Sequence, residues 1–217
     1  MKSPEQLRSD VEQELAWEPE LNESHIAVSV NDGAVTIHGH VPTYTQKFHA
    51  VRAVERVSGV RAVADELEVR LAGSHVRDDT DIAESIAHRL AWDSTIPRDS
   101  VKAEVADGGV TLRGTVEWDF QRRDAARLVR DVIGVRYVND LIALKPRPAV
   151  KAVESQIASA FGRQASLDAR GVHVTVHDST AVLSGHVHSL AEQRIARSAA
   201  FAAPGVTNVE SHLIVEP

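Results

Sequence analysis

Histidine is the residue type with the clearest chemical potential in this chain, which contains eleven of them. Two groups have the pattern His-x-His, at His38-Gly39-His40 and His186-Val187-His188. Alternate side chains of a strand point to the same face, so each pair could hold a metal ion. A third, otherwise similar segment has Arg113 and Thr115 at these positions, and the chain has no HExxH motif. We therefore expect exposed histidines at strand ends and no metal site.

Nucleophilic catalysis is not indicated by the other polar residues. The chain has no cysteine, which excludes thiolate and disulfide chemistry, and it has no Gly-x-Ser-x-Gly sequence of the kind that presents a catalytic serine. Its carboxylates stand where turns and helix starts are expected, and capping explains them there. We predict that the protein is not an enzyme and has no cofactor.

Nucleic-acid binding is disfavoured by the charge of the chain. The formal net charge is −7, and aromatic residues make up only 4% of the sequence. The chain also lacks a Gly-x-x-Gly loop and paired strand aromatics, two features by which small helix–sheet domains bind RNA. We expect no nucleic-acid partner.

The segment 118–130 is the strongest candidate for a binding surface. Several of its arginines follow the i, i+4, i+7 spacing of one helical face, and aromatic residues stand at its start. Arginines combined with aromatic side chains suit the headgroup layer of an anionic membrane. The alternative is a solvated helix face on which Asp119, Asp124 and Asp131 offset much of the arginine charge. The candidate lipid-binding residues are Trp118, Phe120, Arg122, Arg123, Arg127 and Arg130.

A 12-residue sequence motif occurs three times and divides the chain into repeats. It reads VNDGAVTIHGHV at 30–41, VADGGVTLRGTV at 105–116 and VHDSTAVLSGHV at 176–187. A glycine in each phrase is followed twenty residues later by a second glycine, and both glycines keep their register from copy to copy. The chain therefore consists of three copies of an internal repeat of about 70 residues. The glycines predicted to be structural are Gly39, Gly59, Gly114, Gly134, Gly185 and Gly205.

Each repeat has the same order of periodic segments. Apolar residues four apart, such as Leu7, Val11 and Leu15, predict a first helix, and Ser3 with Pro4 marks its start. Period-two alternation then predicts two strands joined by an Asp-containing hairpin turn, and a third strand closes each repeat. The second helix is predicted at 43–57, 118–132 and 189–202.

Two kinds of residue have a predicted structural role within the repeats. The first glycine lies inside a strand, which predicts a bulge or a close approach by a helix. The second glycine is predicted to cap the C-terminus of the second helix. Trp17 and Trp92 follow matching leucines and are predicted to plug the end of each core.

These segments predict an α+β fold. The expected architecture is three tandem αββαβ units, each with a three-stranded sheet covered on one face by two helices. The strand–helix–strand part favours a right-handed crossover. The predicted domains are 3–72, 77–145 and 148–217, with a proline-stiffened link at 145–148.

The order of elements, the glycine before the second helix and the closing phrases resemble the BON domain. The closing phrases read GVRAVADELEV, GVRYVNDLIAL and GVTNVESHLIV. The resemblance covers nearly the whole chain as three tandem copies of the osmotic-stress or transport-associated type. BON domains occur in bacterial osmotic-stress proteins, outer-membrane lipoproteins, and secretin-associated and channel proteins. The resemblance implies binding to a phospholipid surface or to an envelope protein.

We therefore expect a non-enzymatic adaptor associated with stress or the envelope, whose partner is an anionic phospholipid or an unidentified protein. The alternative is a purely structural or self-associating protein-interaction module, such as a homo-oligomer, without lipid affinity. No apolar run follows Lys2, and no stretch approaches the ~20 apolar residues of a membrane span. We accordingly expect no transmembrane segment and a cytoplasmic location.

Overall fold

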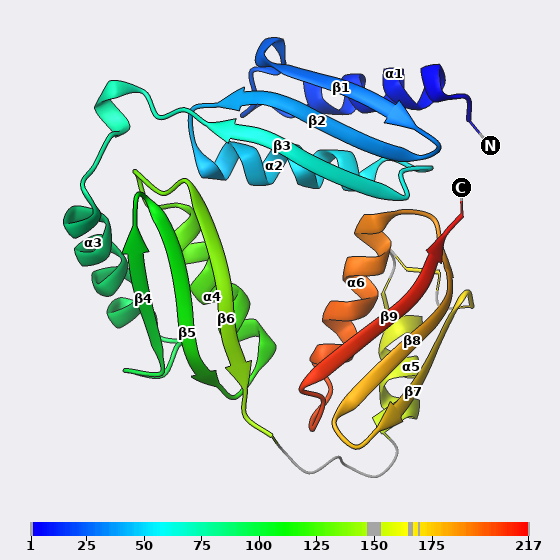
Figure 1. Ribbon diagram of the computed structural model, residues 1–217. Coiled ribbons are helices and arrows are strands. Elements are labelled where there is room, and N and C mark those ends of the chain that lie inside the picture. The colour runs from blue at the N-terminus through cyan, green and yellow to red at the C-terminus, as the bar shows by residue number, and fades with distance from the viewer. Residues whose placement is uncertain (1, 147–152, 165–166, 169, 217) are drawn as a thin grey trace. The chain divides into compact units, whose positions relative to one another are not determined.

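The computed structural model describes residues 2–146, 153–164, 167–168 and 170–216. It contains three units, each with the element order helix, strand, strand, helix, strand (Figure 1). In the first unit these are α1 (Pro4–Ala16), β1 (Ile26–Asn31), β2 (Ala34–Val41), α2 (Tyr44–Arg56) and β3 (Ala62–Val69). In the second they are α3 (Asp79–Trp92), β4 (Val101–Ala106), β5 (Gly109–Val116), α4 (Asp119–Arg130) and β6 (Tyr137–Leu144). In the third they are α5 (Val153–Gly162), β7 (Val172–His177), β8 (Thr180–Val187), α6 (Leu190–Phe201) and β9 (Asn208–Val215).

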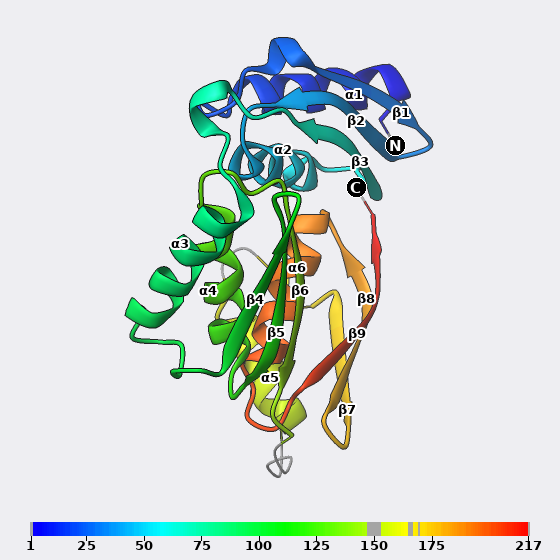
Figure 2. The same ribbon diagram turned by 60° about the vertical axis from the view of Figure 1, so that its left-hand side comes forward.

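Each unit folds around its own three-stranded sheet, in which the second strand is central. The first two strands form an antiparallel hairpin, for example with Val101 opposite Gly114. The third strand is parallel to the second in the second and third units, as the strand–helix–strand connection requires. In the second unit α3 and α4 lie on the same side of the sheet (Figure 2). The predicted α+β fold of three αββαβ units is confirmed.

The helices bury the apolar stripes that the sequence indicates. Leu7, Val11 and Leu15 of α1 are buried, and the corresponding residues of α5 are buried in the same way. Ala125 of the second helix is completely buried, because its small side chain lets the helix lie close to the sheet. Burying one Leu or Ile side chain contributes about 1.5–3 kcal/mol, so these stripes are a main source of stability in each unit.

Local sequence signals define the start of the chain and the hairpin turns as expected. The Ser3 hydroxyl accepts a hydrogen bond from the Gln6 N–H, and the Gln6 side chain accepts one from the Ser3 N–H, which completes a capping box. In the first hairpin, Asp32 and Gly33 have φ values of 45° and 77°. Two successive positive φ values are typical of the type I′ turn, which matches the twist of the strands it joins.

The first repeated glycine is approached by a backbone carbonyl, so the predicted approach by a helix is wrong. Gly114 lies opposite Val101 and has a φ of +145°. A Cβ on Gly114 would overlap the carbonyl oxygen of Ser100, the residue just before β4. That same carbonyl accepts a hydrogen bond from the Thr115 N–H at 3.1 Å. Gly39 and Gly185 have the same environment in their units.

The second repeated glycine does not cap its helix, contrary to the prediction. In the second unit α4 ends at Arg130, and Gly134 is the third residue of a β-turn that starts at Val132. The Val135 N–H donates to the Val132 carbonyl at 3.3 Å, and the φ of Gly134 is +99°. A positive φ at the third position is the requirement of a type II turn. The glycine therefore reverses the chain from helix to strand after the helix has already ended.

Two further details differ from the sequence-based expectations. Trp17 and Trp92 do not plug the cores, because their exposed fractions are 84% and 86%. Both stand at the C-terminal end of the first helix of their unit, Trp17 just after α1 and Trp92 as the last residue of α3. The predicted stiff link at 145–148 and the start of the third domain at 148 lie partly outside the described residues. Within the described residues, no helix is both long enough and apolar enough to span a membrane.

Candidate functional site

The candidate lipid-binding residues lie on or next to α4, whose start is held by Gln121. The Gln121 Oε1 accepts hydrogen bonds from the N–H groups of Glu117 and Trp118, at 3.0 and 3.1 Å. Its Nε2 donates to the carbonyl of Thr95 at 2.9 Å. The buried Gln121 side chain thus ties the first turn of α4 to the loop between α3 and β4.

Asp119 is the buried carboxylate of this site, with only 3% of its surface exposed. It forms an ion pair with Arg122, and its Oδ2 lies 2.9 Å from the Nε of Arg123. A negative charge in the first turn of a helix is favourable, and burial strengthens its attraction to both guanidinium groups. Two of the candidate arginines therefore have an internal partner.

The remaining candidate arginines also have carboxylates close by. Arg127 lies 3.4 Å from Asp124, one turn earlier on α4. Arg130 lies 3.4 Å from Asp131, the residue after the helix. These distances are those of loose, partly solvated pairs, which contribute little to stability. The aspartates of this segment thus offset part of its positive charge, as the alternative interpretation states.

The side chains of α4 separate into an inner and an outer set. Phe120 is 44% exposed, and the side chains of Arg123 and Arg127 are 55% and 50% exposed. The spacing i, i+3, i+7 places these three residues on one face, which we name the α4 outer strip. Trp118 is half-buried, and the Arg122 side chain is only 26% exposed. The six candidates therefore do not form one continuous surface.

Arg122 occupies a repeat position that faces the third strand of its unit. Partial burial raises the pKa of Asp140 on β6, whereas the N–H of Ile142 and the charge of Arg122 favour its ionised form. In the third unit the residues at these two positions are Gln193 and Ser211, and their side chains form a neutral hydrogen bond of 3.2 Å. Helix and strand are thus linked by a direct hydrogen bond in the third unit and by the electrostatic effect of Arg122 on Asp140 in the second.

The repeat position of Gln121 and Glu192 holds a buried polar side chain, which the sequence analysis missed. Glu192 is the counterpart of Gln121 and is 6% exposed. Its carboxylate accepts hydrogen bonds from the N–H of His188 at 2.6 Å and from the N–H of Asp168 at 2.7 Å. The sequence does carry a signal for this role, because Gln46, Gln121 and Glu192 keep the repeat spacing and each is the third residue of the second helix.

In the pair His186 and His188, the two histidines have different carboxylate neighbours. His186 lies 3.4 Å from Glu216, whereas His188 lies 3.2 Å from Glu192, a carboxylate already committed to backbone N–H groups. Across the described residues there is no group of three or more His, Asp or Glu side chains placed to hold a metal ion.

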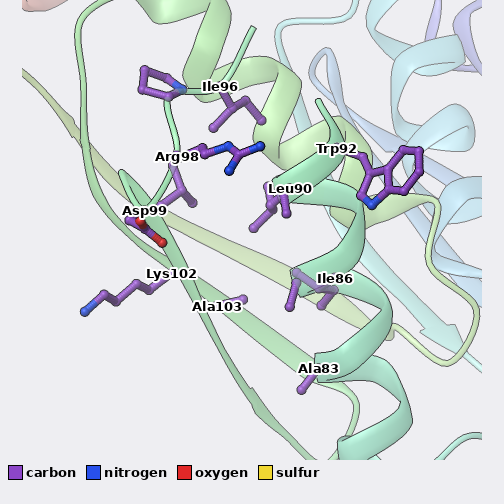
Figure 3. A pocket seen from close by; sticks show the side chains of 13 residues that line it. Ala83, Ile86, Leu90, Trp92, Ile96, Arg98, Asp99, Lys102 and Ala103 are labelled. Atoms are coloured by element: carbon purple, nitrogen blue, oxygen red, sulfur yellow. The ribbon is translucent and has the colours of Figure 1, made fainter. Parts of the chain in front are cut away.

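The second unit also has a groove that the sequence analysis did not identify. It lies between α3 and β4 and has a volume of about 650 Å³ (Figure 3). Ile86 and Leu90 of α3 line one side, and Val101 and Ala103 of β4 line the other. The sequence offered no direct signal, because the groove depends on how closely a helix approaches a strand edge.

The model of the BON domain matches the chain three times, at residues 3–70, 78–146 and 149–217. Among curated proteins, none matches this sequence significantly.

Solved structures that resemble the chain include two of CdsD, described as a structural protein of the type III secretion system of Chlamydia trachomatis. One is 16% identical, covers 97% of this chain and 92% of its own, and has a TM-score of 0.28. The other, a C-terminal domain, is 16% identical, covers 96% of each chain and has a TM-score of 0.27. The PrgH periplasmic domain is 8% identical, covers 89% of this chain and 96% of its own, and has a TM-score of 0.25.

These TM-scores are too low to support an argument from the solved structures. The family model is different, because it matches almost the entire length in three consecutive copies. It agrees with three αββαβ units and with the resemblance of the closing phrases. The chain therefore belongs to the BON domain family and consists of three BON domains in tandem.

Proposed function

We propose that the protein is a non-enzymatic adaptor that binds an anionic phospholipid surface through the α4 outer strip of its second BON domain. The observation that supports this is the strip itself, in which Phe120, Arg123 and Arg127 are exposed on one helical face. An exposed aromatic ring can enter the headgroup layer while the guanidinium groups beside it meet lipid phosphates.

The ion pairs of α4 set the expected strength of this binding. One arginine near an anionic surface contributes about 1 kcal/mol. Asp119 and Asp124 reduce this contribution, because they already attract Arg123 and Arg127. Binding is therefore weak and sensitive to salt. It depends on Phe120 more than on the half-buried Trp118.

The test is flotation with phosphatidylcholine/phosphatidylglycerol vesicles at low and high salt. The double variant Arg123→Glu, Arg127→Glu should weaken binding at low salt by at least about 2 kcal/mol, or roughly 30-fold. The control is Arg163→Glu, Arg197→Glu, which makes the same charge change at exposed sites of the third domain. Equal flotation of the two variants, or flotation with pure phosphatidylcholine alone, would contradict the proposal.

Recognition of a protein partner is the second candidate function, and a separate observation favours it. The second domain has an apolar groove beside the edge strand β4, and Trp92 at its rim is almost fully exposed. An exposed aromatic residue next to an apolar groove is typical of protein-binding sites. If the protein does not bind vesicles at low salt, lipid binding is excluded and recognition of a protein partner is the function that stands.

A further inference from the structure

We infer that the groove between α3 and β4 is a docking site for an extended peptide segment in which apolar and acidic side chains alternate. The inference rests on the protein-binding part of the proposed adaptor function and does not depend on the lipid part. Four features of the second BON domain support it: an open strand edge, a helix face without large side chains, an apolar wall and cationic residues.

The first feature is the hydrogen-bonding edge of β4. Strand β4 is one of the two edge strands of its sheet. The bond from the Thr115 N–H to the Ser100 carbonyl identifies that pair as hydrogen-bonded, and such pairs alternate along an antiparallel ladder. Val101, Ala103 and Val105 therefore present their N–H and C=O groups to the open edge. An extended peptide can add to such an edge as a further strand.

The second feature is the face of α3 beside that edge. The edge-facing helix positions are Ala83 and Ala87 in the second domain, whereas the first domain has Arg8 and Glu12 there. The Arg8 Nε pairs with the Glu12 Oε1 at 2.7 Å, so the first helix fills this face with two long side chains. Two alanines leave the corresponding space open.

The third domain closes its edge in a different way. Glu154 of α5 occupies the position of Ala83, and its Oε1 accepts a hydrogen bond of 2.7 Å from the N–H of Val176. Val176 corresponds to Val105, whose N–H has no such partner within the described part of the chain. Exposed strand edges are usually covered or blocked in this manner. Among the described residues of the three domains, only those of the second combine an open edge with two alanines on the helix beside it.

The third feature is the apolar wall, which determines the pattern of the peptide. Figure 3 shows Leu90 of α3 directed toward the groove, with Ala103 on the facing strand, whereas Ile86 beside them is completely buried. Alternate side chains of an added strand would point toward α3 and meet this wall. The side chains between them would point to the opposite face of the sheet. A volume of about 650 Å³ lies within the range of ligand-binding clefts.

The fourth feature is the charge around the groove. Arg98 reaches across it from the loop before β4, and Lys102 lies on the strand face turned away from α3 (Figure 3). Neither cation has an ion pair within the described residues. Lys102 would thus lie beside the outward side chains of an added strand, which favours an acidic residue there. Asp99 also lines the groove, with a φ of +60° that reflects a sharply bent loop.

The test uses a fluorescein-labelled peptide Val-Glu-Val-Glu-Val with blocked ends and the full-length protein. Fluorescence anisotropy should show saturable binding of this peptide, and at least tenfold weaker binding of Val-Lys-Val-Lys-Val. The double variant Ala83→Arg, Ala87→Glu copies the first domain onto α3 and should weaken binding at least tenfold. Ala103→Pro removes one outward N–H and should also weaken peptide binding at least tenfold. This variant should still fold, because proline is tolerated on an edge strand.

The matched control is Ser85→Arg, His88→Glu, which adds the same two side chains to α3 away from the groove. It should bind the peptide like the original protein. The proposal is overturned if the unmutated protein does not bind the peptide, or if the two double variants bind it equally. It is also overturned if the Ala83→Arg, Ala87→Glu variant abolishes a dimer seen by analytical ultracentrifugation, because a second copy would then occupy the groove. Flotation of these variants should be unchanged, so a failure here is distinct from a failure of the lipid proposal.

Discussion

Replacement of Gly114 by alanine tests whether the first repeated glycine is structural. The φ of Gly114 is +145°, a conformation that L side chains rarely adopt, and the new Cβ would overlap the Ser100 carbonyl oxygen. The unfavourable φ costs about 1–3 kcal/mol. Relief of the overlap moves the Ser100 carbonyl and weakens its bond to the Thr115 N–H, at about 1 kcal/mol. We expect the free energy of unfolding of the second domain to fall by about 2–4 kcal/mol.

The assay is urea unfolding followed by circular dichroism, with hydrogen exchange of the peptide 109–118 as a report on the second domain alone. For a domain of this size, the expected loss corresponds to a decrease in Tm of roughly 10–30 °C. Gly73→Ala is the control, because no heavy atom lies within 4 Å of its added Cβ. Gly114→Val should be at least as destabilising as Gly114→Ala. If Gly114→Ala unfolds within about 0.5 kcal/mol of the control, the steric argument is refuted. A stable variant that lost ligand binding would instead place Gly114 in a site.

Two further predictions concern a buried carboxylate and the independence of the domains. Glu192→Ala should lower the free energy of unfolding by about 1–3 kcal/mol, because the N–H groups of Asp168 and His188 lose their acceptor. Glu192→Gln should be much milder, since glutamine fills the same position in the other two domains, and equal losses in urea unfolding would disprove this role. Cleavage of the chain between Ala72 and Arg77 should leave two soluble fragments that each melt cooperatively. Aggregation of both fragments in calorimetry would show that the first domain shares its core with the rest.

The fold was largely predictable because the local patterns repeat three times. Apolar residues four apart on α1, alternation in the hairpin strands and the Asp32–Gly33 turn are each local signals. A chance pattern in one copy would not recur in register in the other two. The role of the second glycine was predicted wrongly because two local structures share one signal. A glycine with positive φ after a helix suits both a helix cap and the type II turn at Gly134.

The candidate site was only partly predictable, because burial of charge depends on tertiary contacts. Helical spacing predicts that Arg123 and Arg127 share a face, and they do. The same spacing does not reveal that Asp119 is buried at the start of α4 and draws Arg122 toward itself. The exposure of Trp92 depends on which elements pack against the end of α3, and no local pattern encodes that.

By itself, the sequence determined the family, the number of repeats and the order of elements, because these depend on periodicity and on glycines that tolerate positive φ. Only the tertiary structure decided which charges are paired, which aromatic residues are exposed and where a strand edge stays open. Beside the edge of β4 the helix has Ala83 and Ala87, where the first domain has Arg8 and Glu12 and the third domain has Glu154 at the first of these positions. Whether a strand edge is open depends on the helix that packs beside it, so the sequence of the strand or of the helix alone does not reveal it.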